Sequence, residues 1–207
     1  MAIKVAVNRA LTAITALPTA AALAPGNLTL LSTITASASS TASFTSNINS
    51  NYDSYIFKLY NIHASEGQIF KIHFSVDGGS NYNVSKTTVY WSIYAQEDDG
   101  AAQATYNASA DQANSTAAFN ISRGVSTNND DNCSGTVFLF APSSTTFVKH
   151  FRAKYNELNN TPGINQTFPA GYCNTTSAID AVRFECSAGT FDGIIKMYGV
   201  GPKQSWS

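Results

Sequence analysis

The chain has 207 residues and a formal net charge of −1, and its charged share of 12% is about half the usual value. This composition provides no basic field to attract nucleic acid or an anionic membrane, so we expect neither partner. Aromatic residues, mostly Tyr and Phe, make up 12% of the chain. Because protein interfaces deplete charge and enrich Tyr, this composition is one that an assembly protein would tolerate. The length is enough for one large β domain or for a domain plus an arm.

The front of the chain predicts an extended N-terminal arm over residues 1–43, followed by a folded domain over residues 44–207. The Ser/Thr/Ala tract at residues 33–46 has the composition of a linker. Chain ends with few packing opportunities are ordered only when something holds them, so we expect the arm to lie on a neighbouring subunit. The alternative is that it packs on its own domain as an edge strand and a short helix. The apolar positions expected to make the arm's contacts are Val5, Val7, Leu11, Ile14 and Leu17.

Residues 1–25 also resemble a signal peptide loosely, because two basic residues precede an Ala/Leu/Thr run. Thr12, Thr15 and Pro18 interrupt that run, so we expect a mature arm on a protein made in the cytoplasm. No run is long and apolar enough to span a bilayer, and we expect no membrane insertion.

From Phe44 onward the hydrophobic pattern alternates with a period of two, which predicts strands. In Gln68–Asp77, for example, Phe70 and Ile72 face one side and Lys71 faces the other. The DGGS sequence that follows is a strong turn signal. Similar runs occupy residues 89–94, 117–122, 137–139 and 147–155, and a final hairpin pairs residues 181–187 with 193–200.

About eight strands at this spacing predict an all-β fold, an antiparallel β-sandwich of the jelly-roll type. Helical patterns are confined to the arm and to Gln96–Ala113. Three long polar stretches predict connections, at residues 96–116, 124–133 and 156–172. The oxygen-rich run Asn128–Asn132 suggests calcium, but its spacing does not match an EF-hand, so we interpret it as a solvated loop.

The sequence shows no catalytic pattern, and we expect no enzyme, cofactor or metal. His63, His73 and His150 lie far apart among polar neighbours, which is typical of surface or cross-strand histidines. No serine lies in a nucleophile-elbow pattern, and no phosphate-binding or dinucleotide fingerprint occurs. Cys133, Cys173 and Cys186 fit no zinc motif and predict free thiols, with Cys186 buried in a strand.

Four segments resemble a group of virion-associated proteins of tailed phages, especially marine ones: YDSYIFKLYNI (52–62), SVDGGSNYN (75–83), CSGTVFLF (133–140) and IIKMYGVG (194–201). The resemblance is a pattern of strands and turns, so it implies a setting in a virus particle and transfers no functional residue.

Two non-enzymatic functions follow. The first is a virion structural protein, a capsid decoration or cement protein or a connector, that binds other virion proteins through its arm and one sandwich face and forms homo-oligomers. The second is a receptor- or glycan-binding module of a tail fibre or spike, in which aromatic rings stack on host surface sugars. The tyrosines available for that stacking are Tyr90, Tyr94, Tyr106 and Tyr172.

Overall fold

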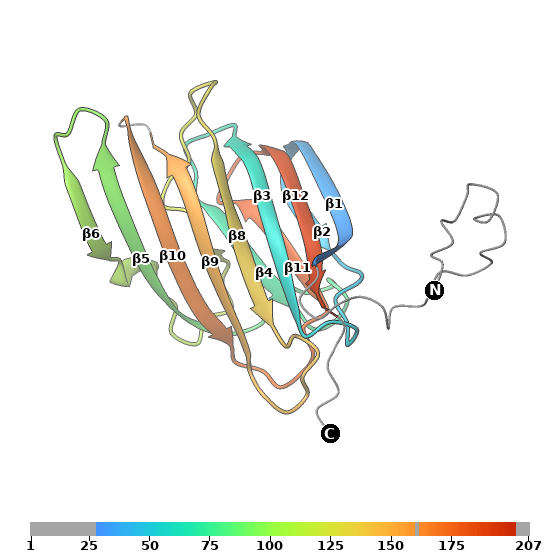
Figure 1. Cartoon of the computed structure of the whole chain (residues 1–207). Helices are drawn as coiled ribbons and strands as arrows, with labels where there is room; N and C mark the ends of the chain where they lie inside the picture. The colour runs from blue at the N-terminus through green and yellow to red at the C-terminus, as the bar shows by residue number, and fades with distance from the viewer. Residues whose placement is uncertain (1–27, 160–161, 202–207) are drawn as a thin grey trace, which may run out of the picture.

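The computed structural model describes residues 28–159 and 162–201, which form two antiparallel sheets packed face to face (Figure 1). The predicted all-β sandwich is confirmed. The larger sheet contains, in spatial order, β1 (Leu28–Ser39), β12 (Phe191–Val200), β3 (Ser54–Ala64), β8 (Cys133–Phe140), β9 (Lys149–Leu158), β10 (Gly163–Cys173), β5 (Lys86–Gln96) and β6 (Ala102–Tyr106). The smaller sheet contains β2 (Thr41–Phe44), β11 (Ala181–Cys186), β4 (Phe70–Ser75) and β7 (Phe119–Asn120).

Eight of these strands have the connectivity of a jelly roll. Numbered first to eighth along the chain, β1, β2, β3, β4, β7, β8, β11 and β12 form one sheet in the order first, eighth, third, sixth. The other sheet has the order second, seventh, fourth, fifth, as two interlocked Greek keys require. The pairs β5–β6 and β9–β10 are insertions that widen only the larger sheet, beyond β8. In Figure 1 these four strands extend the larger sheet beyond β8. The smaller sheet still reaches the nearest of them, since Phe74 of β4 packs on Phe151 of β9.

Aromatic side chains fill the space between the two sheets. Phe184 on β11 lies with its ring centroid 5.5 Å from that of Phe57, 6.1 Å from Phe70 and 6.3 Å from Phe44. These four rings come from both sheets, and each is no more than 3% exposed. The alternation that the sequence shows therefore exists because every second side chain enters this shared core.

The predicted boundary between arm and domain differs from the structure. Leu28–Ser39 pairs with β12 as an edge strand of the larger sheet, and Thr41–Phe44 pairs with β11 in the smaller sheet. The Ser/Thr/Ala tract at residues 33–46 contributes to both strands because its small side chains Ala36 and Ala42 are buried in the core. Residues 28–43 are thus part of the sandwich, and the five predicted arm contacts lie outside the described residues.

Two other local predictions are wrong. Residues 181–187 and 193–200 do not form a hairpin, because β11 pairs with β2 and β4 while β12 pairs with β1 and β3 in the other sheet. The turn between them is therefore a corner of the sandwich. The stretch Gln96–Ala113 contains β6 and a short 3-10 turn at Ala108–Ala110, with no α-helix.

The predicted connection at residues 156–172 contains β10, a strand whose polarity is inverted. Asn165 and Thr167 point inward and are at most 1% exposed, whereas Ile164 on the outer face is 49% exposed. The inner face here lies beyond the smaller sheet, and irregular backbone covers it. The Thr167 hydroxyl donates to Ile121 O at 2.7 Å, so an inward polar group satisfies a carbonyl of the covering segment.

We predict that Phe184→Ala lowers the free energy of unfolding by about 3–5 kcal/mol, because it leaves a cavity among three aromatic rings. Urea unfolding followed by circular dichroism measures this loss. Phe147→Ala is the control, since Phe147 is 72% exposed, and its effect should stay within about 0.5 kcal/mol. Equal effects of the two substitutions would contradict the proposed core.

Candidate functional site

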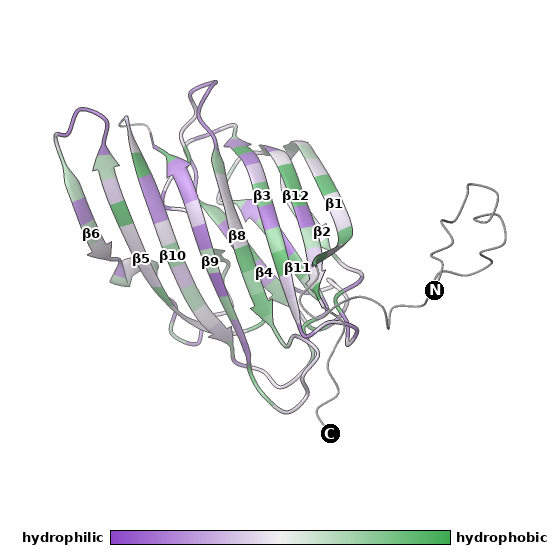
Figure 2. Ribbon diagram, in the orientation of Figure 1, coloured by the Kyte–Doolittle hydropathy of each residue, from purple (hydrophilic) through white to green (hydrophobic). Residues whose placement is uncertain are grey.

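The outer face of the larger sheet carries aromatic and basic side chains in cross-strand register. Along the strands of this sheet apolar and polar residues alternate (Figure 2). On β5 the apolar side chains face solvent, with Val89 45%, Trp91 51% and Ile93 47% exposed. One row across the face, from β12 to β6, consists of Lys196, Lys58, Thr136, Lys154, Phe168, Trp91 and Tyr106.

The cations of this face contact aromatic rings and, within the part of the chain that the structure describes, no carboxylate. Lys58 lies over Tyr198 at 5.3 Å from the ring centroid, and the Arg152 guanidinium lies 4.8 Å from the centroid of Phe138. Among the described residues, the only ion pairs are His73–Glu185 and Arg183–Glu185, on the other sheet. Lys58 is directly opposite Lys196, a like-charge pair that is unfavourable in an isolated sheet. The face therefore presents unneutralised positive charge.

Small residues on β10 create two adjoining apolar hollows on the same face, which we call the outer groove. One, of about 420 Å³, is lined by Phe138, Phe168 and Ala170, and the other, of about 430 Å³, by Val89, Phe140 and Tyr172. Arg152 and Ala170 line both. A groove with apolar walls and a cation at its centre accepts an apolar side chain accompanied by an acidic one.

On the opposite side of this sheet, Glu157 holds the segment that covers the inner face. Glu157 is 1% exposed, and its carboxylate accepts hydrogen bonds from Arg123 N at 2.8 Å and from Gly124 N at 3.1 Å. Burial raises the pKa of Glu157 to about 7, and these hydrogen bonds oppose the rise. Glu157 thereby positions Arg123, whose side chain is exposed.

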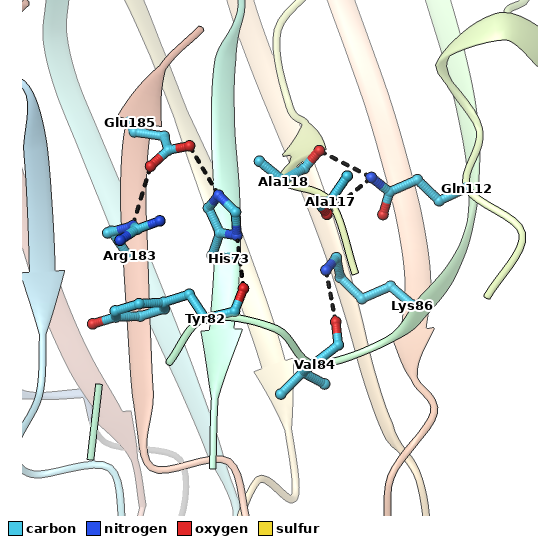
Figure 3. Close-up of polar contacts among 9 residues, drawn as sticks. All are labelled: His73, Tyr82, Val84, Lys86, Gln112, Ala117, Ala118, Arg183 and Glu185. Atoms are coloured by element: carbon cyan, nitrogen blue, oxygen red, sulfur yellow. Dashed lines mark hydrogen bonds and ion pairs between the residues drawn. The ribbon is translucent and has the colours of Figure 1, made fainter. Parts of the chain in front are cut away.

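A polar network lies on the smaller sheet (Figure 3). Glu185 Oε1 is 2.8 Å from His73 Nε2, and Glu185 Oε2 is 3.1 Å from Arg183 Nε. The Arg183 guanidinium stacks over Tyr82, 4.3 Å from the ring centroid, and His73 Nδ1 donates to Tyr82 O at 3.2 Å. Burial lowers the pKa of His73, and its hydrogen bond to Glu185 acts in the opposite direction. Because Glu185 contacts both His73 and Arg183, and each of these contacts Tyr82, we interpret the network as a clamp on the loop that carries Tyr82.

The buried nucleophiles have no access to a substrate. Lys86, Lys149 and Cys173 lie in one register row of β5, β9 and β10, and each is 0% exposed. The ammonium groups donate to backbone carbonyls, Lys86 to Val84 O at 2.8 Å (Figure 3) and Lys149 to Thr175 O at 3.1 Å. Burial lowers the pKa of Lys86 to about 8. All three cysteines are buried and free, as expected for Cys186.

The structure separates the other residues that the sequence singled out. His63 bonds Asp131 O at 2.8 Å, and it does not join His73 or His150 in one site. Within residues 28–159 and 162–201, no three His, Cys, Asp or Glu side chains are placed to hold a metal ion. No helix in this part of the chain is long and apolar enough to cross a membrane.

The four tyrosines considered for sugar stacking have different environments. Tyr90 is 1% exposed and cannot contact a ligand, whereas Tyr106 is 46% exposed beside Trp91, with ring centroids 5.3 Å apart. Tyr172 faces His150 on the outer face, and Tyr94 lines a polar cleft on the inner face. The outer groove was not predicted, because its residues come from strands that are distant in sequence.

No protein-family model matches the chain, and no curated protein sequence matches it.

We predict that the carboxyl group of Glu157 makes the fold less stable as the pH rises. Its pKa is about 7 in the fold and near 4.5 in the unfolded chain, so the protonated form is favoured by folding. This contribution is complete below pH 4.5 and is lost as the pH rises through 7, with a total of about 3 kcal/mol. Denaturant unfolding of the wild type and Glu157→Gln at several pH values checks it. The wild type should lose stability relative to the variant from pH 4.5 to 8, and a constant difference would refute the shift.

Proposed function

We propose that this chain is a structural protein of a virus particle, a capsid decoration or cement protein or a connector, which docks on other virion proteins through the outer face of its larger sheet. The observation that carries the proposal is that face itself, with exposed Trp91, Val89 and Ile93 beside cations that have no carboxylate partner in residues 28–159 and 162–201. Exposed apolar surface of this kind marks interaction sites.

The composition of the face favours a protein partner. Interfaces are enriched in Tyr, Trp, Phe and Arg, and their strongest contacts are anchors seated in desolvated pockets. The outer groove provides such a pocket, with Arg152 at its centre. A partner that inserts an apolar side chain and places carboxylates near Lys58 and Lys196 would neutralise the charges that oppose each other across β3 and β12.

The virion setting is supported by the phage-like segments. Three of the four, residues 52–62, 133–140 and 194–201, fall largely on β3, β8 and β12, which are neighbours in the larger sheet. The fourth, residues 75–83, contains the Gly78–Gly79 turn and the clamped Tyr82. Jelly rolls occur both in viral capsids and in lectins, so the topology is compatible with either setting.

The arm positions remain part of the proposal. Val5, Val7, Leu11, Ile14 and Leu17 precede β1, which is the edge strand of the larger sheet. Apolar contacts of residues 1–27 with a neighbouring virion subunit, or with a second copy of the chain, would add to docking by the face.

We predict that Arg152→Gln weakens binding of the purified chain to virus particles that lack it by about tenfold, because it removes the cation at the centre of the outer groove. Co-sedimentation with the particles over a concentration series measures the affinity. Trp91→Ser should weaken binding similarly. Arg123→Gln is the matched control, since Arg123 is also exposed but lies on the other side of the sheet, and it should bind like the wild type.

Wild-type affinity for both Arg152→Gln and Trp91→Ser would refute docking through this face. A version starting at Leu28 tests the arm separately, since it retains every strand. Weaker binding by this version would support an arm contact, and unchanged binding would confine the interface to the sandwich.

A further inference from the structure

A polar cleft opens on the inner side of the larger sheet, where the smaller sheet does not reach. It has a volume of about 350 Å³, within the usual range for small-molecule sites. Its walls come from β5, β6, β10 and the covering segment. The residues that line it are Tyr94, Gln103, Arg123, Gly124, Asn159 and Asn165.

Two amide side chains in the cleft lack partners. Asn165 is 1% exposed, and its Oδ1 has no hydrogen-bond partner among the described residues. Oδ1 of Asn159 is likewise buried and unpartnered within them. Leaving a buried polar atom unpaired costs about 1–3 kcal/mol, so two such atoms in one cleft require an explanation. Neither oxygen has accessible surface in this conformation, so a ligand that donates to both requires a rotation of each amide toward the cleft and then supplies the missing partners.

Arg123 gives the cleft a positive charge. Glu157 binds the backbone N–H of Arg123, not its guanidinium, and Arg123 forms no ion pair with any described residue. The guanidinium therefore remains available to form a bidentate contact with a carboxylate.

Tyr94 supplies an aromatic wall, and the backbone keeps it in place. Tyr94 is paired in register with Asn165 on one side and with Gln103 on the other, so all three side chains project from the same face. A Cβ on Gly163 would lie 3.1 Å from Tyr94 Cε2, so glycine at this position leaves room for the ring. An aromatic ring flanked by two amides is suited to stacking on a sugar ring while bonding its hydroxyls.

We infer that this cleft binds a saccharide that carries a carboxylate, a site distinct from the outer face and independent of the docking proposed above. Hydroxyl groups of the sugar donate to Asn165 and Asn159, the carboxylate pairs with Arg123, and the ring lies against Tyr94. Each of these three parts of the ligand corresponds to a different observation. The hydroxyls correspond to the unpartnered amide oxygens, the carboxylate to the Arg123 guanidinium, and the sugar ring to the aromatic wall.

The site has room for more than one sugar unit. Arg123 also lines a second hollow of about 370 Å³, together with Asn107, Ser109, Asn120 and Ser122. Ile69, Tyr90 and Ala110 complete its lining, so hydroxyl and amide groups alternate there with apolar surface. A chain of two or more units with a carboxylate at Arg123 would therefore occupy both hollows, so an oligosaccharide should bind more tightly than a monosaccharide.

Isothermal titration calorimetry of the full chain with methyl β-D-glucuronide tests the inference, with methyl β-D-glucoside as the uncharged analogue. The glucuronide should bind at least about tenfold more tightly than the glucoside, because only it pairs with Arg123. Arg123→Gln should abolish that preference. Arg152→Gln, on the outer face, is the matched control and should preserve it.

A second readout locates the ligand. In an amide NMR spectrum the side-chain NH₂ signals of Asn165 and Asn159 should shift on addition of glucuronide, and an oligoglucuronide should shift them at lower concentration. Absence of binding, equal binding of both glycosides, or an unchanged preference in Arg123→Gln would overturn the inference. If the chain docks on virus particles normally but binds no glucuronide, the saccharide site is refuted and the proposed docking function is unaffected.

Discussion

The mismatch in width between the two sheets is the constraint on which the rest of this structure depends. A jelly roll of eight strands buries both inner faces completely, but here the larger sheet has four additional strands that the smaller sheet covers only in part. Phe74 of β4 packs on Phe151 of β9, and Phe119 of β7 packs on Tyr90 of β5. Irregular backbone closes the rest of their inner face. The carbonyl and amide groups of that backbone have no partners in a sheet, so the strands facing it must supply polar side chains. Thr167 and Glu157 are two such side chains.

Two distinct surfaces result from this single constraint. Because the polar side chains of β5 and β10 point to the inner face, the alternating apolar side chains point to the outer face. Trp91 and Ile164 are therefore exposed to solvent. The same inversion leaves Asn165 inside a cleft that protein atoms do not fill. The outer face is therefore suited to a protein partner and the inner cleft to a small polar ligand, on opposite sides of the same strands.

The two surfaces also give the virion and glycan hypotheses separate physical bases. A jelly roll that attaches to a particle by one face leaves the end of its inserted strands available for another molecule. The proposed docking on a particle, centred on Arg152, and the inferred binding of an acidic sugar at Arg123 would then be compatible in one chain. The clamp of His73 and Glu185 contributes to neither surface and holds a loop on the smaller sheet.

Prediction from sequence succeeded where alternation reports burial in a shared core. Phe70, Ile72 and Phe74 in β4, and Phe151 and Tyr155 in β9, are buried as their period-two pattern indicated. The same reasoning missed β10, because Asn165 and Thr167 occupy inward positions that a hydrophobic pattern assigns to solvent. It also misjudged the low-complexity tract, since Ala36 and Ala42 enter the core with side chains too small to give a strong signal.

By itself the sequence determined that this chain is an antiparallel β-sandwich, because local alternation and turn residues depend only on neighbours along the chain. Tertiary structure alone decided which strands pair and which face of β5 and β10 is exposed to solvent. It also decided which side chains meet in the outer groove and in the inner polar cleft. Those outcomes depend on pairing between residues far apart in sequence, such as Lys154 with Phe168 across one sheet or Arg123 with Glu157 across the interior. No local pattern encodes them, since each side chain's environment is set by the segment that happens to cover it.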